Sequence, residues 1–388
     1  MRILILSFFY PPDIGPGALR AKSIVDALIK EGPSELKIDV LTTLPNRYHS
    51  LNISALQHEV SGKVSISRFI LPRHKNRIFD QSKAFALFSL SVQKFVYKKK
   101  WDIVLATSGR LMTAILATWV AKQTNSKLYL DIRDLFTDAM SNIHAKKPLQ
   151  IVMPIFKLLE KWSFCSANRI NVVSAGFLEH FKKISPKLSP TVYTNGVDDL
   201  FYKNNFSINQ TEKIPVILYA GNIGDGQGLH KIIPRVASEL KDINFRLIGD
   251  GSARKLLTNN KIFGAQNNIE ILKPILREDL INEYEKANVL FLHLNDFNSF
   301  HKVLPSKIFE YAATGKPILA GVKGYAAEFL RDQVKGVEIF DPGDTERMKA
   351  GLQKLLNGPK YIDRKSFCLQ YSRNKIMEKL AKDVLLLS

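Results

Sequence analysis

The sequence predicts an α/β protein with two doubly wound domains that face each other across a cleft. Its 388 residues suffice for two domains of the usual size, about 100–200 residues each. Apolar runs of strand length alternate with stretches whose apolar residues recur at helical spacing. The order strand, glycine-rich loop, helix also occurs twice, at the N-terminus and again near residue 214. Ligands bind such sheets at the carboxyl ends of the strands, so the expected site lies between the domains.

The first domain is predicted over residues 1–200. Residues 2–8 are apolar on both faces, as in a central parallel strand. A loop rich in proline and glycine follows, with Gly15 and Gly17, and apolar residues at helical spacing then predict a helix over residues 18–30. Further strands are predicted, with helices between them, over residues 38–42, 64–69, 103–107, 128–131, 169–173 and 191–193.

The second domain is predicted over residues 210–365. The polar and poorly periodic stretch 195–214 is the expected linker. A strand over residues 216–220 comes next, then a loop from Gly221 to Gly228 and a helix over residues 229–240. Further strands are predicted over residues 245–248, 269–272, 289–292, 317–320 and 337–340, and a last helix over residues 366–388.

Charge is the most unusual feature of the composition. The chain has 56 basic and 36 acidic residues, a net charge of +20. Such an excess calls for a polyanionic partner, which could be nucleic acid, an anionic membrane surface or a phosphorylated small molecule. Residues 1–200 hold 28 basic and 15 acidic residues, and residues 201–388 hold 28 and 21, so the excess is concentrated in the first half.

Other classes of protein are disfavoured. Apolar residues make up 45% of the chain and charged residues 24%, which is typical of a folded globular protein. Two cysteines, Cys165 and Cys368, cannot form a disulfide framework or a CxxC metal site. The apolar N-terminal run stops at Pro11, Pro12 and Asp13, as a buried strand does and a signal peptide does not. Since no apolar stretch reaches the length needed to span a bilayer, we expect a cytoplasmic protein, either soluble or peripheral to the membrane.

The glycine-rich loop of the second domain is the first candidate for chemistry. It follows a strand and opens a helix, so backbone N–H groups and a helix N-terminus face any anion there, typically a phosphate. A flexible loop with helix-capping glycines is the plainer reading. The loop that contains Gly15 and Gly17 is a weaker version, and a tight turn set by proline and glycine explains it equally well. Neither loop has the Gly-Lys-Ser/Thr of a Walker motif.

Charged residues on a predicted helix and at the end of a predicted strand are further candidates. Lys307 and Glu310 share a face of a helix that starts near Pro305. Lys307 could meet a phosphate and Glu310 could accept hydrogen bonds from ribose hydroxyls, although an exposed ion pair is the commoner role. The stretch from Asp131 to Asp134 ends a strand, where cleft residues lie, or it is a surface loop. Scattered histidines and the absence of any Asp-x-Asp do not support a metal site.

A basic and aromatic region lies in the first domain. Residues 85–97 are apolar and aromatic, and lysines or arginines flank them from Arg73 to Lys100. Apolar residues beside clustered basic ones suit the anionic cytoplasmic leaflet of a membrane. An ordinary core helix with a solvated basic end explains the pattern equally well.

Four stretches together resemble a known family. They begin at Phe8 (FFYPPDIG), Leu159 (LEKW, continued by ANRINVVS from Ala167), Tyr219 (YAGNIG, continued by QGL from Gln227) and Pro305 (PSKIFE, continued by ATGKPI from Ala313). Their order and spacing are similar to those of bacterial retaining glycosyltransferases of family four, which have the GT-B fold. The chain looks closest to members that build O-antigen and other surface polysaccharides, including fucosamine-transferase-like enzymes. The resemblance spans nearly the whole chain.

The resemblance implies that the C-terminal domain binds a nucleotide-sugar and the N-terminal domain binds the acceptor. It also implies that the last helix, 366–388, crosses back onto the first domain. Glu310 matches the ribose-binding glutamate, and Arg133-Asp134 falls where relatives have a His-Asp pair near the reacting sugar. The other residues implied at the donor or its phosphates are Gly15, Gly17, Gly221, Asn222, Gly224, Gln227, Ile275 and Ser306.

This chain departs from the broad family at two places. Lys302 stands where relatives have a second glutamate, and Asn222 and Gln227 stand where they have an arginine and a lysine. Lys307 is therefore the expected partner of the diphosphate, with Lys302 and Arg133 as secondary candidates. We expect a metal-independent reaction with no cofactor, in which the departing phosphate helps to deprotonate the acceptor. A UDP-sugar donor and an acceptor on a polyprenyl diphosphate at the inner membrane face are favoured. A nucleotide-sugar 2-epimerase and a nucleic-acid-binding protein are the alternatives.

Overall fold

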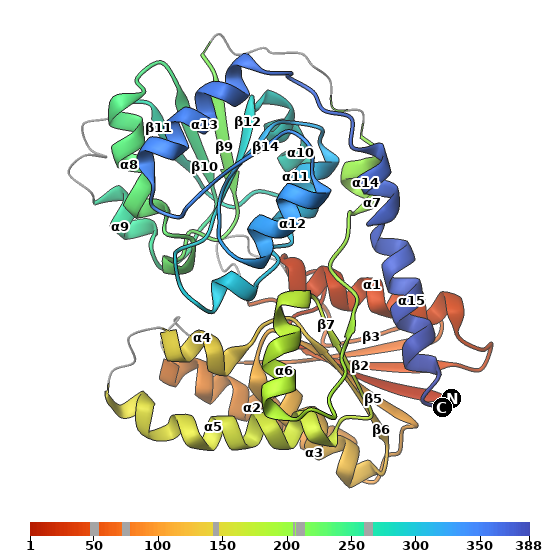
Figure 1. Ribbon diagram of the computed structural model, residues 1–388. Helices are drawn as coiled ribbons and strands as arrows, with labels where there is room; N and C mark the ends of the chain where they lie inside the picture. The colour runs from red at the N-terminus through yellow and green to blue at the C-terminus, as the bar shows by residue number, and fades with distance from the viewer. Residues whose placement is uncertain (47–53, 72–77, 143–146, 205, 207–213, 260–266) are drawn as a thin grey trace. The chain divides into compact units, whose positions relative to one another are not determined.

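The computed structural model describes residues 1–46, 54–71, 78–142, 147–204, 206, 214–259 and 267–388 (Figure 1). The chain divides into two compact units. Unit 1 comprises Met1–Asn195 and Arg373–Ser388, and unit 2 comprises Gly196–Ser372. The chain thus passes between the units twice, after Asn195 and after Ser372. The sequence places the corresponding divisions at residues 200–210 and after residue 365.

Unit 1 is built on a sheet of eight strands in the order β3-β4-β2-β1-β5-β6-β7-β8. All neighbouring strands are parallel except β3 and β4. The central strand β1 pairs Ile3 with Ile38 of β2 on one side and with Ile103 of β5 on the other. The strands are β1 Arg2–Leu6, β2 Lys37–Thr43, β3 His58–Ser61, β4 Val64–Phe69, β5 Ile103–Ser108, β6 Lys127–Ile132, β7 Arg169–Val172 and β8 Thr191–Val192.

Helices cover both faces of this sheet. On one face α1 (Pro16–Glu31) and α15 (Arg373–Leu385) pack together, and Leu380 and Val384 of α15 join a core with Ile24 of α1. The other face carries α2 (Ile78–Val96), α3 (Leu111–Thr124) and α5 (Lys147–Ser166) (Figure 1). The shorter helices are α4 (Phe136–Asn142) and α6 (Leu178–Ile184). Within the described ranges, every helix is too short or too polar to cross a bilayer.

Unit 2 has a second, fully parallel sheet in the order β11-β10-β9-β12-β13-β14. One apolar core lies between the sheet and α10, α11, α12 and α14, and another lies under α8 and α13. The strands are β9 Val216–Ala220, β10 Asn244–Ile248, β11 Ile269–Leu272, β12 Val289–His293, β13 Ile318–Gly321 and β14 Val337–Phe340. The helices are α7 Asp199–Tyr202, α8 Leu229–Glu239, α9 Arg254–Thr258, α10 Arg277–Lys286, α11 Lys307–Ala313, α12 Tyr325–Gln333, α13 Thr345–Asn357 and α14 Lys365–Gln370.

Three details differ from the sequence prediction. The first strand ends at Leu6 rather than at residue 8. Strand β3 was not expected, because this short edge strand is mostly exposed and has no apolar alternation. The last helix, predicted as one over residues 366–388, is two helices, α14 and α15. It breaks because the backbone at Tyr371 and Ser372 pairs with Val197 instead of continuing the helix.

The carboxylate of Asp131, on β6, is the polar centre of unit 1. It is fully buried and accepts two hydrogen bonds from Arg20 of α1, of 2.8 and 2.7 Å. The Thr107 hydroxyl and the Asn171 amide also donate to it, at 2.6 and 2.7 Å. Burial alone would raise the pKa of Asp131, but Arg20 and these donors lower it. The expectation that Asp131 is a cleft residue is therefore wrong, because every one of these contacts is internal to the fold.

Arg20 carries this connection further along the chain. Its two terminal nitrogens donate to the carbonyls of Thr194 and Tyr193, at 3.0 and 2.7 Å. One guanidinium thus connects α1 to β6 and to residues 193–194, just before the chain leaves unit 1 at Asn195. Removing one partner of such a buried pair leaves a charge without compensation.

Replacing Arg20 with methionine should therefore destabilise unit 1 strongly. We expect a loss of about 3–5 kcal/mol of unfolding free energy, the usual cost of breaking a buried ion pair. Denaturant unfolding of the full chain measures it. Lys22→Met is the matched control, because Lys22 pairs with Asp26 on the exposed side of the same helix and should change stability by no more than about 0.5 kcal/mol. Equal losses in the two variants would contradict this role of Arg20.

Candidate functional site

The glycine-rich loop of unit 2 is held by its own side chains. It leaves β9 at Gly221 and enters α8 after Gly228, which has the left-handed φ of 61°. The Asn222 amide donates to the side-chain oxygen of Gln227 at 2.8 Å, and the Gly224 N–H donates to the same oxygen at 3.2 Å. The Tyr219 hydroxyl donates to the Asn222 carbonyl at 2.6 Å. Asn222 and Gln227, expected to bind the donor, thus bind each other and shape the loop.

Lys307 and Glu310 lie against this loop. A Cβ placed on Gly221 would be 2.8 Å from Cε of Lys307, so only glycine lets the lysine approach so closely. The Lys307 ammonium is 3.2 Å from the Glu310 carboxylate. The Lys307 side chain is 22% exposed and that of Glu310 10%, so the pair is not an ordinary exposed ion pair. The structure therefore brings together the loop, the cation and the carboxylate that the sequence singled out.

Two tyrosines behind the pair were not expected from the sequence. The hydroxyl of the buried Tyr284, on α10, donates to the Glu310 carboxylate at 3.3 Å. The Ala220 N–H donates to the Tyr311 hydroxyl at 3.2 Å, which fixes the end of β9 against α11. Burial raises the pKa of Tyr284 well above its ordinary value, so this phenol stays a hydrogen-bond donor. The two residues are far from the loop in sequence, and no local pattern marks them.

His293, at the end of β12, contacts the backbone of the glycine-rich loop. Its Nδ1 lies 2.6 Å from the Gln227 carbonyl, and its Nε2 lies 3.3 Å from the Gly343 N–H. Burial lowers the pKa of His293 to about 4, so the ring is neutral, with its proton on Nδ1 and Nε2 accepting from Gly343. Asn295 adds a second support, since its amide donates to the Asp225 carbonyl at 3.1 Å. Scattered histidines gave no signal for this role.

Three other expected donor residues have less distinctive surroundings. Ser306 immediately precedes α11, and its carbonyl accepts a hydrogen bond from the Phe309 N–H at 3.1 Å. Lys302 ends a 3₁₀ turn, Phe300–Lys302, and is half-buried. Ile275 is half-buried and packs against the apolar core of unit 2. Their roles at a donor stay predictions.

Unit 1 holds a second cluster, at the start of α1. Gly15 caps this helix and Gly17 lies in its first turn. A Cβ on Gly17 would be only 2.5 Å from a terminal nitrogen of Arg133, which follows β6. The guanidinium therefore lies beside the N-terminus of a 16-residue helix, an arrangement with positive potential that suits an anion. Asp134, the next residue, is exposed, and its carboxylate accepts the Leu135 N–H at 3.0 Å.

A largely buried polar cluster around His180 supports the segment that follows Asp134. Glu160, on α5, accepts the Thr137 hydroxyl at 2.7 Å and lies 3.2 Å from Nε2 of His180, and Nδ1 of His180 lies 3.4 Å from Asp138. Burial alone would lower the pKa of His180, but the two carboxylates raise it to about 9, so the ring carries a charge. The cluster fixes α4 directly after Arg133 and Asp134. Glu160 lies in one of the stretches that carry the family resemblance.

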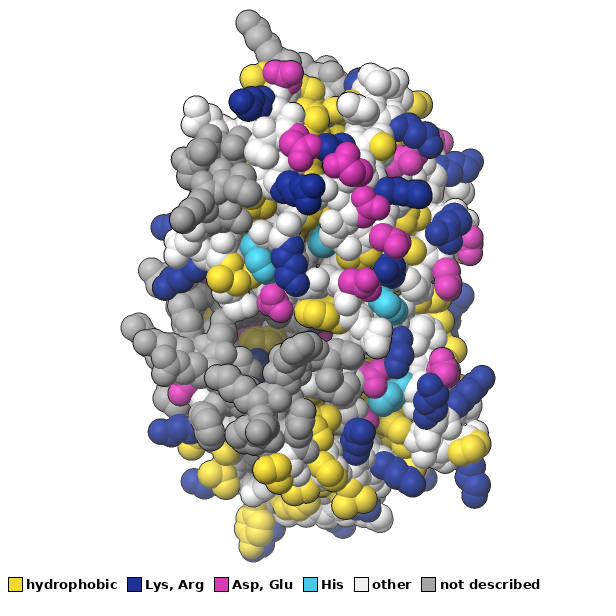
Figure 2. Space-filling view, turned by 60° about the vertical axis from the view of Figure 1, so that its left-hand side comes forward, with side chains coloured by type: hydrophobic (Ala, Val, Ile, Leu, Met, Phe, Trp, Pro, Cys, Tyr) yellow, Lys and Arg dark blue, Asp and Glu magenta, His cyan; other side chains and the backbone are white. Residues whose placement is uncertain are grey.

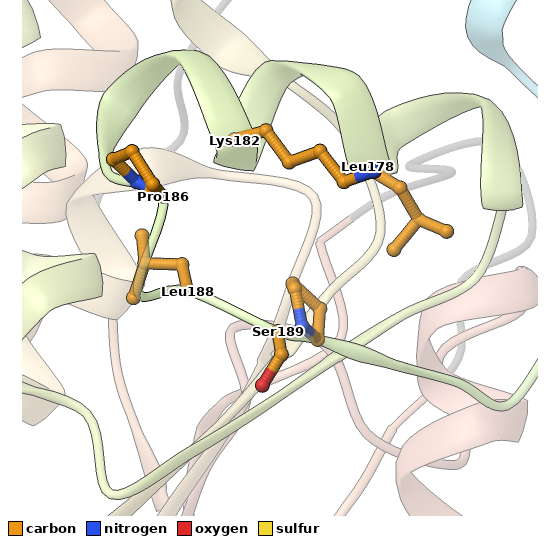
Figure 3. A pocket seen from close by; sticks show the side chains of 6 residues that line it. Leu178, Lys182, Pro186, Leu188 and Ser189 are labelled. Carbon is orange, nitrogen blue, oxygen red and sulfur yellow. The ribbon is translucent and has the colours of Figure 1, made fainter.

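A pocket in unit 1 lies apart from these residues. It has a volume of about 460 Å³ and is lined by Leu178, Lys182, Pro186, Leu188, Ser189 and Pro190 (Figure 3). The apolar side chains around it come from α6 and from the turn before β8 (Figure 3). Since none of its lining residues belongs to the expected site, the pocket is not part of the candidate. Nowhere in the described part of the chain do three His, Cys, Asp or Glu side chains gather as metal ligands would.

Comparisons with known proteins show what this chain is similar to. Residues 202–373, nearly all of unit 2, match the family Glycosyl transferases group 1. The chain is 22% identical over 387 residues to WcaI of Escherichia coli K12, a provisionally named colanic acid biosynthesis glycosyl transferase, and 93% of each protein is covered.

Solved structures extend the comparison to the fold. Anabaena Alr3699/HepE in complex with UDP-glucose matches with a TM-score of 0.70 at 14% identity, over 100% of this chain and 99% of that one. WaaG, a glycosyltransferase involved in lipopolysaccharide biosynthesis, matches with a TM-score of 0.67 at 13% identity, over 98% and 99%. At these identities the likeness shows the fold, which is GT-B with two Rossmann-like domains.

Acid should weaken unit 2 through His293. The folded pKa of about 4 lies below the ordinary value, so the histidine contributes stability above pH 6.5 that is lost as the pH falls towards 4. The full loss is about 3 kcal/mol, from about 2.5 pKa units, and about 2 kcal/mol of it is lost by pH 5. His293→Gln, which keeps a donor for the Gln227 carbonyl, should remove this part of the pH dependence. Hydrogen exchange of unit 2 amides at pH 7 and pH 5 measures it.

The control for this experiment is His58→Gln, because His58 is exposed and lies in unit 1. That variant should keep the wild-type pH dependence of unit 2. If His293→Gln also keeps it, the assignment of a neutral bridging histidine is wrong.

Proposed function

We propose that this chain, whose residues 202–373 match the group 1 glycosyltransferase family, transfers a sugar from a nucleotide-sugar to a saccharide acceptor in bacterial surface polysaccharide synthesis. The observation that carries the proposal is the assembly of Gly221, Lys307 and Glu310 in one place. A glycine loop that opens a helix, a neighbouring ammonium and a nearly buried carboxylate suit a diphosphate joined to a ribose. UDP is the favoured nucleotide, because the similar HepE structure holds UDP-glucose.

The proposed roles follow from the charges. In the donor complex the Lys307 ammonium turns from Glu310 to the diphosphate, and the Glu310 carboxylate accepts hydrogen bonds from the ribose hydroxyls. Tyr284 keeps the carboxylate in place from the other side. Ser306, Lys302 and Ile275 are proposed to make further contacts with the donor.

The proposed reaction is a front-face transfer with retention of configuration and without a metal. The bond between the anomeric carbon and the diphosphate oxygen breaks, the acceptor hydroxyl oxygen bonds to that carbon, and its proton passes to the departing phosphate. Backbone N–H groups, Lys307 and the α8 N-terminus stabilise the leaving charge. Arg133, with Gly15 and Gly17, supplies a second positive group in unit 1, and Asp134 is proposed to contact the reacting sugar or acceptor.

The acceptor is proposed to be a saccharide on a polyprenyl diphosphate, with the enzyme peripheral at the inner face of the cell membrane. WcaI and WaaG are described by colanic acid and lipopolysaccharide biosynthesis, and O-antigen, the saccharide proposed here, belongs to the same class of surface polysaccharide. The charge excess in residues 1–200 supports a polyanionic surface as partner of that half. Within the expected contact region Arg73–Lys100, residues 73–77 lie outside the described part of the chain, and α2 covers most of the rest.

Lys307→Ala should lower turnover by about 100-fold or more, because one preorganised group at the leaving charge contributes about 10²–10³ to the rate. The measurement is release of UDP from a panel of UDP-sugars, with a bacterial lipid extract as acceptor. Lys241→Ala is the control, since Lys241 is exposed just after the far end of α8. Turnover that stays at the wild-type level in Lys307→Ala excludes the proposed role. Epimerised donor in the absence of acceptor would favour a 2-epimerase instead.

Glu310→Ala should act mainly on donor affinity. Loss of charge-assisted hydrogen bonds to the ribose predicts a dissociation constant for the nucleotide-sugar about 10- to 100-fold higher. Calorimetric titration of wild type and variant with the same UDP-sugar measures it. Glu270→Ala is the control, because Glu270 is an exposed carboxylate on β11 that pairs with Arg246. An unchanged affinity in Glu310→Ala removes this residue from the donor site.

A further inference from the structure

Three helices form one outer layer of unit 1. Helix α3 packs against α2 on one side and against α5 on the other, and all three cover the sheet face opposite α1 and α15 (Figure 1). Their inner sides are part of the core, since Phe88 of α2, Ala117 of α3 and Phe164 of α5 are buried. The outer side of this layer is named here the α2–α3–α5 face.

Helix α5 places apolar side chains on that face. Ile151, Ile155 and Leu158 are 77%, 58% and 68% exposed. Their spacing of four and three residues puts them on one stripe of the helix, while Met153 and Phe164 lie buried on the inner side. A surface helix normally turns polar residues outward. This helix is apolar on both sides, so its outer stripe calls for a partner.

The neighbouring helices continue the apolar surface. Leu87 and Leu90 of α2 are 37% and 53% exposed, and Trp119 of α3 is 37% exposed. Figure 2 shows yellow side chains gathered at the lower end of the view, with dark blue side chains among them.

The charged residues of the face are almost all basic. Exposed lysines come from each helix: Lys83 and Lys94 from α2, Lys122 from α3, and Lys157 and Lys161 from α5. Among the described side chains of the three helices the acidic residues are Asp80, half-buried in the first turn of α2, and Glu160, which is buried on the inner side against Thr137 and His180. The face is thus apolar in its middle and positive around it.

We propose that the α2–α3–α5 face docks on a bilayer that contains anionic lipid. Ile151, Ile155 and Leu158 enter the boundary between headgroups and acyl chains, and the lysines reach the phosphates with their long stems along the apolar surface. A second copy of the chain fits less well, because a symmetric contact through this face would oppose lysines to lysines. The proposal rests on the proposed function in one respect: it places the enzyme at the surface where a lipid-linked acceptor resides.

Vesicle co-sedimentation of the full chain tests the proposal. The vesicles are phosphatidylcholine alone, or phosphatidylcholine with one third phosphatidylglycerol. We expect the wild type to bind the mixed vesicles, bind plain vesicles at least tenfold more weakly, and release as salt rises. The triple variant Ile151→Ser, Ile155→Ser, Leu158→Ser should bind mixed vesicles at least tenfold more weakly, since each apolar side chain contributes to insertion. Lys157→Glu with Lys161→Glu should show a similar loss.

The control triple variant is Leu256→Ser, Leu369→Ser, Leu386→Ser, whose leucines are 56%, 45% and 71% exposed but lie outside the face. It should bind as the wild type does. The proposal is overturned if the α5 variant binds mixed vesicles like the wild type, if lipid charge has no effect, or if the wild type is a dimer that the α5 variant makes monomeric. A UDP-sugar titration of the same α5 variant keeps the two proposals apart. If the wild type binds a UDP-sugar but no vesicles, only the docking is overturned. If it binds vesicles but no UDP-sugar, only the proposed sugar transfer is overturned.

Discussion

The buried pair of Asp131 and Arg20 is the interaction on which unit 1 depends. A carboxylate without water is tolerated only with full hydrogen bonding, and here one arginine, one hydroxyl and one amide provide it. Strand geometry gives this pair a consequence for function. Alternate residues of a strand face the same side, so Arg133, two residues after Asp131, also turns toward α1. Helix α1 is thus fixed to β6 through its own Arg20, and Arg133 lies against its first turn at Gly17.

In the described part of unit 2, hydrogen bonds from neutral groups shape the glycine loop. Under the proposed function this loop meets a diphosphate and has to hold one shape. The Gln227 side chain accepts the Gly224 N–H within the loop, and the neutral His293 donates to the Gln227 carbonyl from β12. A loop fixed in advance loses little entropy when a ligand binds. The close approach of Lys307 to Gly221 places a cation directly against this loop.

The sequence predicted most of the fold because parallel strands are buried on both faces and appear as continuous apolar runs. It singled out the loop, Lys307 and Glu310 as candidate site residues because their chemistry and their position after a strand are local features. It failed where partners are distant. Asp131 looked like a site residue until Arg20, 111 residues away, was seen to bind it. Tyr284, His293 and the cluster of Glu160 and His180 act through contacts that no spacing reveals. The break at Tyr371 has the same origin, since Val197 causes it.

The proposed function requires unit 2 to recognise a nucleotide-sugar. A thermal-shift screen of the wild-type chain against nucleotide-sugars tests this most directly, because a ligand that binds only the folded state raises the melting temperature. We expect a rise in melting temperature that saturates with concentration for at least one UDP-sugar, and a smaller rise for UDP. No rise with any nucleotide-sugar, together with steeply salt-dependent binding to nucleic acid, would contradict it.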